Sequence, residues 1–116
     1  MTASQTTAST YLGRLRETLK LSRERMARLL NTSAKSVERW EAAQSQPSSS
    51  LVRDRMARIE QVAQLGLTVY TPDGFHRFLD TPLLEFSGLT PLQMIEVGQA
   101  DRVVSALAAD FEGLGA

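Results

Sequence analysis

Apolar residues recur every three or four positions along most of this chain, which is the spacing of helices that bury one face. In the segment before residue 20, for example, Leu12, Leu15 and Leu19 fall on one side of a helix. Alternation typical of strands is limited to the brief stretch Leu67–Tyr70. The spacing predicts an all-α chain with helices at residues 10–20, within 22–41, and at 51–66, 72–79, 82–86, 91–96 and 99–112.

Residues 22–41 predict two helices joined by a sharp turn. Ser22 and Ser33 can each cap a helix, because a serine hydroxyl accepts a hydrogen bond from an unpaired N–H of the first turn. Asn31 lies between them, and asparagine tolerates the left-handed conformation that such a turn requires. Val37 and Trp40 lie three residues apart on the second helix, so both are predicted to face the first helix.

Further cap residues mark the later boundaries. Ser50 is predicted to cap the helix at 51–66, and Gly66 to end it. Three Thr-Pro pairs then predict helix starts, because threonine caps a helix and proline lacks the N–H that is unpaired in a first turn. These pairs are Thr71-Pro72, Thr81-Pro82 and Thr90-Pro91, and Gln93 adds a capping box to the third.

Charge is unevenly distributed, although the net charge of the whole chain is zero. Residues 1–60 hold eleven cations and six anions, a net charge of +5, whereas residues 61–116 hold two cations and seven anions, a net charge of −5. A basic half and an acidic half indicate two separate tasks. The basic half is the one suited to a nucleic-acid surface.

The composition excludes several kinds of site. The chain has no cysteine, which excludes disulfides and thiolate metal sites, and its single histidine, His76, cannot form a zinc site alone. We expect no metal and no cofactor. No apolar run approaches the ~20 residues of a membrane span, and the start MTASQTTAST lacks the features of a secretory signal. A cytoplasmic protein without membrane contact is therefore predicted.

The turn at residues 22–41 resembles the helix-turn-helix of Xre/Cro-type repressors, whose pattern is approximately S-Q-x-x-L-A-x-x-x-G-V-S-x-x-x-I-x-x-W-E. The matching residues are Ser22, Met26, Ala27, Ser33, Val37, Trp40 and Glu41. Asn31 replaces the usual glycine, and Arg23 the usual glutamine. The resemblance implies that the second helix enters a DNA major groove. The implied DNA-binding residues are Ala34, Lys35 and Arg39 at base-reading positions, with Arg23, Ser33 and Ser36 beside them, Arg23 and Ser36 nearer to phosphate.

The alternative interpretation of residues 22–41 is an ordinary helical hairpin, with Trp40 in the core and Arg39 as a solvated charge. If the segment does bind DNA, a homodimer is expected, because repressors of this type usually bind as two-fold dimers. The carboxylate of Glu38 argues against DNA binding, since it would repel phosphate unless it accepts a hydrogen bond from cytosine.

Residues 67–116 contain no recognisable catalytic arrangement. No serine nucleophile with a plausible base, no glycine-rich phosphate loop and no cluster of metal ligands can be found there. The carboxylates are too evenly spread to nominate a pair. An acidic helical segment without reactive groups favours a protein-binding surface over an enzyme.

The string from Phe75 to Ala116 has an ordered set of motif residues. It resembles the C-terminal domain of Xre/MbcA/ParS-type antitoxins, with the approximate pattern W-L-x-T-P-N-x-x-L-x-G-x-x-P-x-x-L, a glycine, a helix R-V-x-x-x-L and a final E-G. Leu83 stands where that family commonly has asparagine, and Phe86-Ser87 replace Leu/Gly-rich positions. The matching residues are Phe78, Leu79, Thr81, Pro82, Gly88, Thr90, Pro91, Leu92, Ile95, Gly98, Arg102, Val103, Leu107, Glu112 and Gly113.

This second resemblance implies an antitoxin. Members of the family neutralise a co-encoded RES-domain toxin that destroys NAD⁺, by packing the C-terminal domain over the nucleotide pocket of the toxin, and the complex represses its own promoter. The terminal DFEGLGA is suited to entering a cleft, although a frayed terminus is the alternative. The implied toxin-binding residues are Leu79, Gly88, Thr90, Pro91, Asp110, Phe111, Glu112, Gly113, Leu114, Gly115 and Ala116.

Three segments are therefore predicted: a disordered tail at residues 1–9, a helix-turn-helix domain at 10–66 and a toxin-binding domain at 67–116. The expected partners are a RES-domain toxin, operator DNA and a second copy of the chain, which form a higher-order complex. The alternative hypothesis is a stand-alone Xre-type transcriptional regulator whose C-terminal half dimerises or senses a ligand. A RES-type gene beside this one favours the antitoxin, and its absence favours the regulator.

Overall fold

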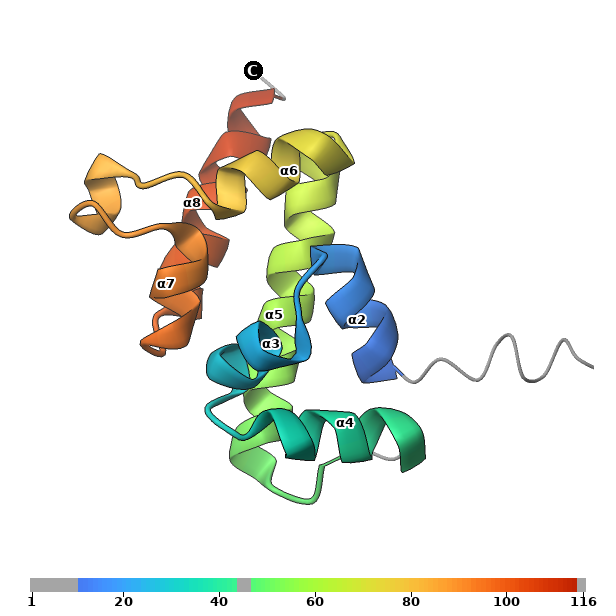
Figure 1. Cartoon of the computed structure of the whole chain (residues 1–116). Coiled ribbons are helices and arrows are strands. Elements are labelled where there is room, and N and C mark those ends of the chain that lie inside the picture. Colours follow the sequence, from blue (N-terminus) through green and yellow to red (C-terminus); the bar gives the residue numbers. More distant parts are fainter. Residues whose placement is uncertain (1–10, 44–46, 115–116) are drawn as a thin grey trace, which may run out of the picture. The chain divides into compact units, whose positions relative to one another are not determined.

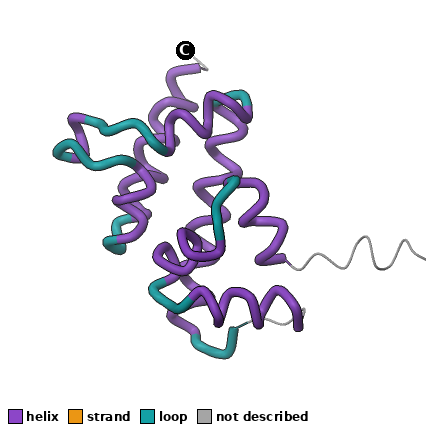
Figure 2. Tube along the Cα trace, viewed as in Figure 1, coloured by secondary structure: helices purple, strands orange, loops and turns teal. Residues whose placement is uncertain are grey.

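The computed structural model describes residues 11–43 and 47–114, and every regular element in those ranges is helical (Figures 1 and 2). This confirms the predicted all-α fold. The predicted tail at residues 1–9 lies outside the described residues, as do Gly115 and Ala116. The helices are α2 (Tyr11–Leu19), α3 (Arg23–Leu30), α4 (Ala34–Ala43), α5 (Ser50–Val69), α6 (Pro72–Leu79), the 3-10 helix η1 (Leu84–Phe86), α7 (Pro91–Glu96) and α8 (Ala100–Leu114).

The chain divides into two compact units, Met1–Met56 and Ala57–Ala116. The division falls within α5, so this helix contributes residues to both units. The functional domains predicted at residues 10–66 and 67–116 stay a prediction.

In the first unit, α4 packs against both α2 and α3. Val37 on α4 is fully buried, as predicted, whereas Trp40 is only half-buried. The difference arises because a three-residue step rotates a side chain well short of a full helical turn, which places Trp40 at the rim of the interface. The buried apolar residues of this unit are Leu12, Leu15, Leu19, Met26, Ala27, Leu29, Leu30, Val37 and Met56.

In the second unit, α7 packs against α8 and α6 packs against α7. Aromatic rings occupy much of this core: Phe75 and Phe78 stack with ring centroids 6.4 Å apart, and Phe86 is 2% exposed. The buried apolar residues are Ile59, Val62, Ala63, Phe75, Phe78, Leu79, Phe86, Leu92, Met94, Ile95, Ala100, Val103 and Leu107. Nearly all of the aromatic packing of the described chain is therefore in this unit.

The structure corrects two predicted boundaries of α5. Gly66 does not end the helix, which continues to Val69. A Cβ at Gly66 would lie 2.0 Å from Cε1 of Phe75, so glycine is required here for the close approach of the buried ring. At the other end, the hydroxyl of Ser49, not Ser50, accepts the capping bond, from the N–H of Val52 at 3.4 Å. The predicted cap was wrong by one residue.

Two of the three Thr-Pro pairs start helices as predicted. Thr71 caps α6 by accepting a bond from Gly74 N at 3.1 Å, and Thr90 forms a capping box with Gln93 at the start of α7. The prediction for Thr81 was wrong, because its hydroxyl donates to the carbonyl of Arg77 and so completes α6 instead of opening a new helix. The helix predicted at 82–86 is reduced to the single 3-10 turn η1.

Candidate DNA-binding and partner-binding surfaces

The turn between α3 and α4 has the geometry that the sequence predicted. The hydroxyl of Ser22 accepts a bond from Arg25 N at 3.0 Å, and that of Ser33 accepts one from Ser36 N at 3.0 Å. Asn31 adopts the left-handed conformation (φ 58°, ψ 49°), and Thr32 N reaches the Ala27 carbonyl at 2.9 Å. Each helix end is thereby satisfied locally. These caps fix a three-residue turn between the two helices.

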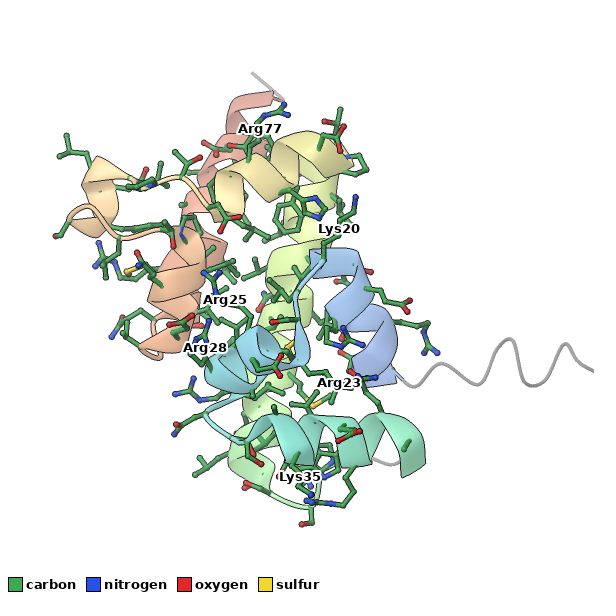
Figure 3. All side chains as sticks on the ribbon, viewed as in Figure 1. Lys20, Arg23, Arg25, Arg28, Lys35 and Arg77 are labelled. Carbon is green, nitrogen blue, oxygen red and sulfur yellow. The ribbon has the colours of Figure 1, made fainter. Side chains whose placement is uncertain are left out.

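The predicted base-reading side chains lie along the first turns of α4. Lys35, which Figure 3 labels, is exposed, as is Arg39, whereas Ala34 and Ser36 are half-buried. Arg39 donates to the Ser36 hydroxyl at 3.4 Å, and its guanidinium lies 5.8 Å from the Trp40 ring centroid. Stacking on an aromatic face limits the rotamers of an arginine. The surface therefore presents Lys35 and a partly preorganised Arg39.

Ser33 and Ser36 are also bonded to each other. The Ser33 hydroxyl donates to the Ser36 hydroxyl at 3.0 Å while accepting the Ser36 N–H. The oxygen of Ser33 is therefore already engaged in starting α4. A role for either serine in DNA binding stays a prediction.

Arg23, the predicted phosphate-contacting residue, is held by a carboxylate in this structure. Its Nε lies 3.0 Å from Oε1 of Glu41, and Nε of Arg16 lies 2.6 Å from Oε2 of the same carboxylate. The side chain of Glu41 is only 10% exposed, against 46% for Arg23. Glu41 therefore joins α2, α3 and α4 through two guanidinium groups, and one of these remains accessible to a ligand.

The network around Glu41 has an electrostatic consequence. Burial by itself raises the pKa of the Glu41 carboxyl, but hydrogen bonds and charge from Arg16 and Arg23 outweigh burial, so the pKa lies below its usual value of 4.5. The bond from Glu41 raises the pKa of Arg16. Glu41 stays ionised at neutral pH and is not available as a proton donor. Sequence reasoning missed Arg16, because its partner lies 25 residues away and no local signal links them.

An open hollow of about 370 Å³ lies beside this network. Three carboxylates and two guanidinium groups line it, so it does not favour an anion. Its lining residues are Gly13, Arg16, Glu17, Arg23, Glu38, Glu41 and Ala42. Nothing in this lining indicates a bound small molecule.

The predicted toxin-binding residues of the second unit differ in their exposure. Leu79 and Pro91 are buried, and Thr90 is half-buried and engaged in its capping box. That these three residues contribute to toxin binding stays a prediction. They would do so by shaping the surface around them and not by direct contact. The residues that the structure presents to solvent are Gly88, Asp110, Phe111, Glu112 and Gly113, with Phe111 being 49% exposed.

The exposed residues fall on two separate elements. Gly88 belongs to the loop after η1, whereas Asp110–Gly113 lie on the last turns of α8, which remains helical to Leu114. The helix therefore includes much of the terminal segment that the sequence predicted to enter a cleft.

Tyr70, which the sequence did not single out, contacts one of these predicted residues. Its hydroxyl donates to Asp110 Oδ2 at 3.4 Å, and its ring stacks on Phe78 with centroids 5.2 Å apart. Burial, followed by the charge of Asp110, raises the pKa of the Tyr70 hydroxyl. The bond ties the end of α8 to the residue that follows α5. Forty residues separate the partners, which explains why no sequence signal revealed the contact.

Residues 11–43 and 47–114 contain no group of three or more His, Cys, Asp or Glu side chains placed to hold a metal ion. Among the helices in the same ranges, none combines the length and the apolar character needed to cross a bilayer.

No protein-family model matches the chain, and no curated protein sequence matches it. Among solved structures, the chain is similar to a chain of the crystal structure of the M. tuberculosis MbcT–MbcA toxin–antitoxin complex, with a TM-score of 0.72 and 25% sequence identity. The match covers 88% of this chain and 91% of the other. This fold occurs in a toxin–antitoxin complex.

The match includes both units, since it covers most of the chain. It supports the resemblance to MbcA-type antitoxins that the motifs at 75–116 predicted. It also agrees with the all-helical fold of the described residues.

Proposed function

We propose that this chain is a type II antitoxin that binds and neutralises a RES-domain, NAD⁺-degrading toxin. The observation that carries the proposal is the similarity over 88% of the chain to a chain of the MbcT–MbcA toxin–antitoxin complex. The antitoxin role, as opposed to that of the toxin, is supported by the capped turn between α3 and α4 and by the basic charge around it. A DNA-reading segment suits the component that represses the operon.

In this proposal the second unit covers the active site of the toxin. Residues 57–116 carry eight carboxylates and three cations, a net charge of −5, which suits a protein surface that binds phosphate groups. The exposed end of α8 supplies Phe111 with Asp110 and Glu112 beside it. The chain itself is proposed to perform no catalysis and to need no cofactor.

Co-expression tests the neutralisation. Cells expressing the co-encoded toxin should keep their NAD⁺ and grow when the full chain is present. A chain truncated after Asp110 should fold, because Phe111 and Glu112 lie exposed on the last turns of α8, yet it should fail to protect. Protection by the truncated chain would show that the terminus is not the inhibitory element. Failure of the full chain to protect would reject the antitoxin role and favour a stand-alone regulator.

The first unit is proposed to bind operator DNA through α4. A second copy of the chain is proposed to bind beside it, as a homodimer. Arg39→Ala should weaken operator binding by ~1–3 kcal/mol if Arg39 contacts a base edge. Arg77→Ala is the matched control, because Arg77 is an exposed arginine on α6 of the second unit (Figure 3). A gel-shift titration on promoter DNA measures both. Equal affinities for the two variants would reject the role of Arg39.

A further inference from the structure

Residues 81–90 form a loop that is closed by its own backbone. Leu83 N donates to the Leu89 carbonyl at 3.1 Å, and Gly88 N donates back to the Leu83 carbonyl at 2.9 Å. Ser87 and Gly88 both have positive φ, of 58° and 88°, which reverses the chain inside the loop. Glycine suits the second position because it adopts this conformation without a side-chain clash. The loop therefore has a defined shape before any partner binds.

The base of the loop is fastened to α8. Phe86 is 2% exposed, and the guanidinium of Arg102 lies 5.7 Å from the centroid of its ring. Arg102 also donates from Nη2 to the Glu85 carbonyl at 2.8 Å. A buried ring, a cation over its face and a side-chain bond to the backbone together fix the position of the loop on its own unit.

The tip of this fixed loop is an apolar side chain that its own unit leaves uncovered. Leu84, the first residue of η1, is 96% exposed, and Leu89, in the part of the loop that leads back to α7, is 36% exposed. Single exposed leucines are common on protein surfaces. Here, however, the exposed leucine is held on a preformed loop together with a second apolar residue. Preorganisation of this kind lowers the entropy lost on binding.

Charge indicates what covers the tip. Residues 81–90 contain one charged residue, Glu85, which lies beside Leu84, and the whole second unit has a net charge of −5. A second copy of this acidic surface would be repelled. The complementary partner is a protein with an apolar pocket bordered by cations. The loop also includes Gly88 and Thr90, which the resemblance to Xre/MbcA/ParS-type antitoxins implied as toxin-binding residues.

We propose that Leu84 is an anchor residue that inserts into an apolar, cation-bordered pocket on the toxin. This inference rests on the proposed antitoxin function and adds a contact outside the terminal segment. The residues that carry most of the binding energy of an interface cluster near its centre, where surrounding contacts exclude water.

The test compares two exposed leucines in the full chain. Leu84→Asp should weaken binding of the co-encoded RES-domain toxin by about 10- to 150-fold, the range for losing one buried leucine from an interface. Leu51→Asp is the matched control, because Leu51 is 75% exposed on the part of α5 that belongs to the first unit. It should leave toxin binding unchanged. Titration calorimetry with the purified toxin gives both affinities.

A second pair of variants makes the test independent of folding defects. Leu84→Ala adds no buried charge and should still weaken binding by about 10-fold, whereas both Leu84 variants should keep the unfolding midpoint of the wild type. Glu85→Lys should slow association and reduce its dependence on salt, because it reverses the charge beside the anchor.

Three outcomes would overturn the inference. If the wild-type chain does not bind the toxin, the proposed function and the anchor are both rejected. If the wild type binds the toxin and both Leu84→Asp and Leu84→Ala bind it with the wild-type affinity, the anchor is rejected while the antitoxin role stands. If the Leu84 variants change the mass of the free protein in light scattering, the loop is covered by a second copy of the chain instead.

Discussion

Charge ties together the helices of the first unit, whereas aromatic packing ties together those of the second. In the first unit, Glu41 receives bonds from Arg16 and Arg23 and so joins three helices that are each ten residues or shorter. In the second unit, the rings of Phe75 and Phe78 stack against one another, and the Phe75 ring packs closely against Gly66. Electrostatic ties depend on pH and salt, but aromatic packing depends on shape. The two units should therefore respond to different perturbations.

The largest effect is expected where the aromatic packing is removed. Phe75→Ala should lower the free energy of unfolding by about 3–5 kcal/mol, because the ring is fully buried. Gly66→Ala should lower it by about 1–3 kcal/mol, because the new methyl group would overlap that ring. In the Phe75→Ala background, however, Gly66→Ala should be neutral or stabilising, since alanine favours a helix over glycine. Urea unfolding followed by circular dichroism measures all four chains.

This double-mutant cycle isolates the contact between α5 and α6. An equal cost of Gly66→Ala in both backgrounds would contradict the explanation given for the glycine.

The next largest effect is expected from breaking the electrostatic tie. Glu41→Gln should lower the free energy of unfolding by about 1.5–3 kcal/mol at neutral pH, because it removes the charge that two arginines share. The folded pKa of Glu41 is lowered, so its stabilisation is complete above the unfolded value near 4.5 and is lost as pH falls through the folded pKa. The difference between variant and wild type should therefore disappear in acid.

The single tryptophan, Trp40, lies beside Glu41 in α4 and reports on the first unit by fluorescence. A stability difference between Glu41→Gln and wild type that persists unchanged down to pH 2 would contradict the proposed tie. Unfolding curves that coincide when followed by fluorescence and by circular dichroism would show that the two units unfold together.

A smaller effect distinguishes the Thr-Pro pairs. Thr90→Val should lower the free energy of unfolding by about 1 kcal/mol, because it removes the capping box of α7. Thr81→Val should cost less, because Thr81 is exposed and the Arg77 carbonyl to which its hydroxyl donates also accepts a bond from Asp80 N at 3.2 Å. Thermal unfolding at neutral pH compares the two isosteric changes. A larger cost at Thr81 would mean that the loop, and not the cap, controls stability here.

The smallest effect is expected at the exposed glycine of α8. Gly113→Ala should raise the free energy of unfolding by about 0.5 kcal/mol, because alanine favours a helix over glycine and, apart from its chain neighbours and the backbone of its own helix, nothing lies within 4 Å of the added methyl group. It is the counterpart of Gly66→Ala, with the same chemical change in open space. Destabilisation measured in the same urea titrations would show that the end of α8 is not a stable helix.

The sequence predicted local features well because their causes are local. The caps at Ser22, Ser33 and Thr90 and the left-handed Asn31 each depend on residues at most three or four positions apart. The pairing of Glu41 with Arg16 depends on how separate helices meet, and no short-range pattern encodes it. The same limitation explains the incorrect end at Gly66, where a ring nine residues away overrides the usual tendency of glycine.

The residues of the candidate surfaces also divide into those that local sequence predicts and those that depend on long-range packing. Lys35 and Arg39 were implied by the resemblance to Xre/Cro-type repressors and are exposed on α4. The exposure of Leu84 was not predicted, because it depends on the loop failing to continue as a helix after Pro82. The buried positions of Leu79 and Pro91 likewise depend on the packing of the whole unit.

The shared carboxylate of Glu41 also acts as a counterion that the protein carries within itself. If Arg23 turns from Glu41 to a DNA phosphate, the DNA releases a condensed cation, but the partly uncovered Glu41 carboxylate attracts a cation in its place, so the net release of ions is small. Lys35 lies exposed, so its contact with phosphate would release ions in full. The logarithmic dependence of operator affinity on salt should accordingly be shallower than a count of the basic residues on this face suggests.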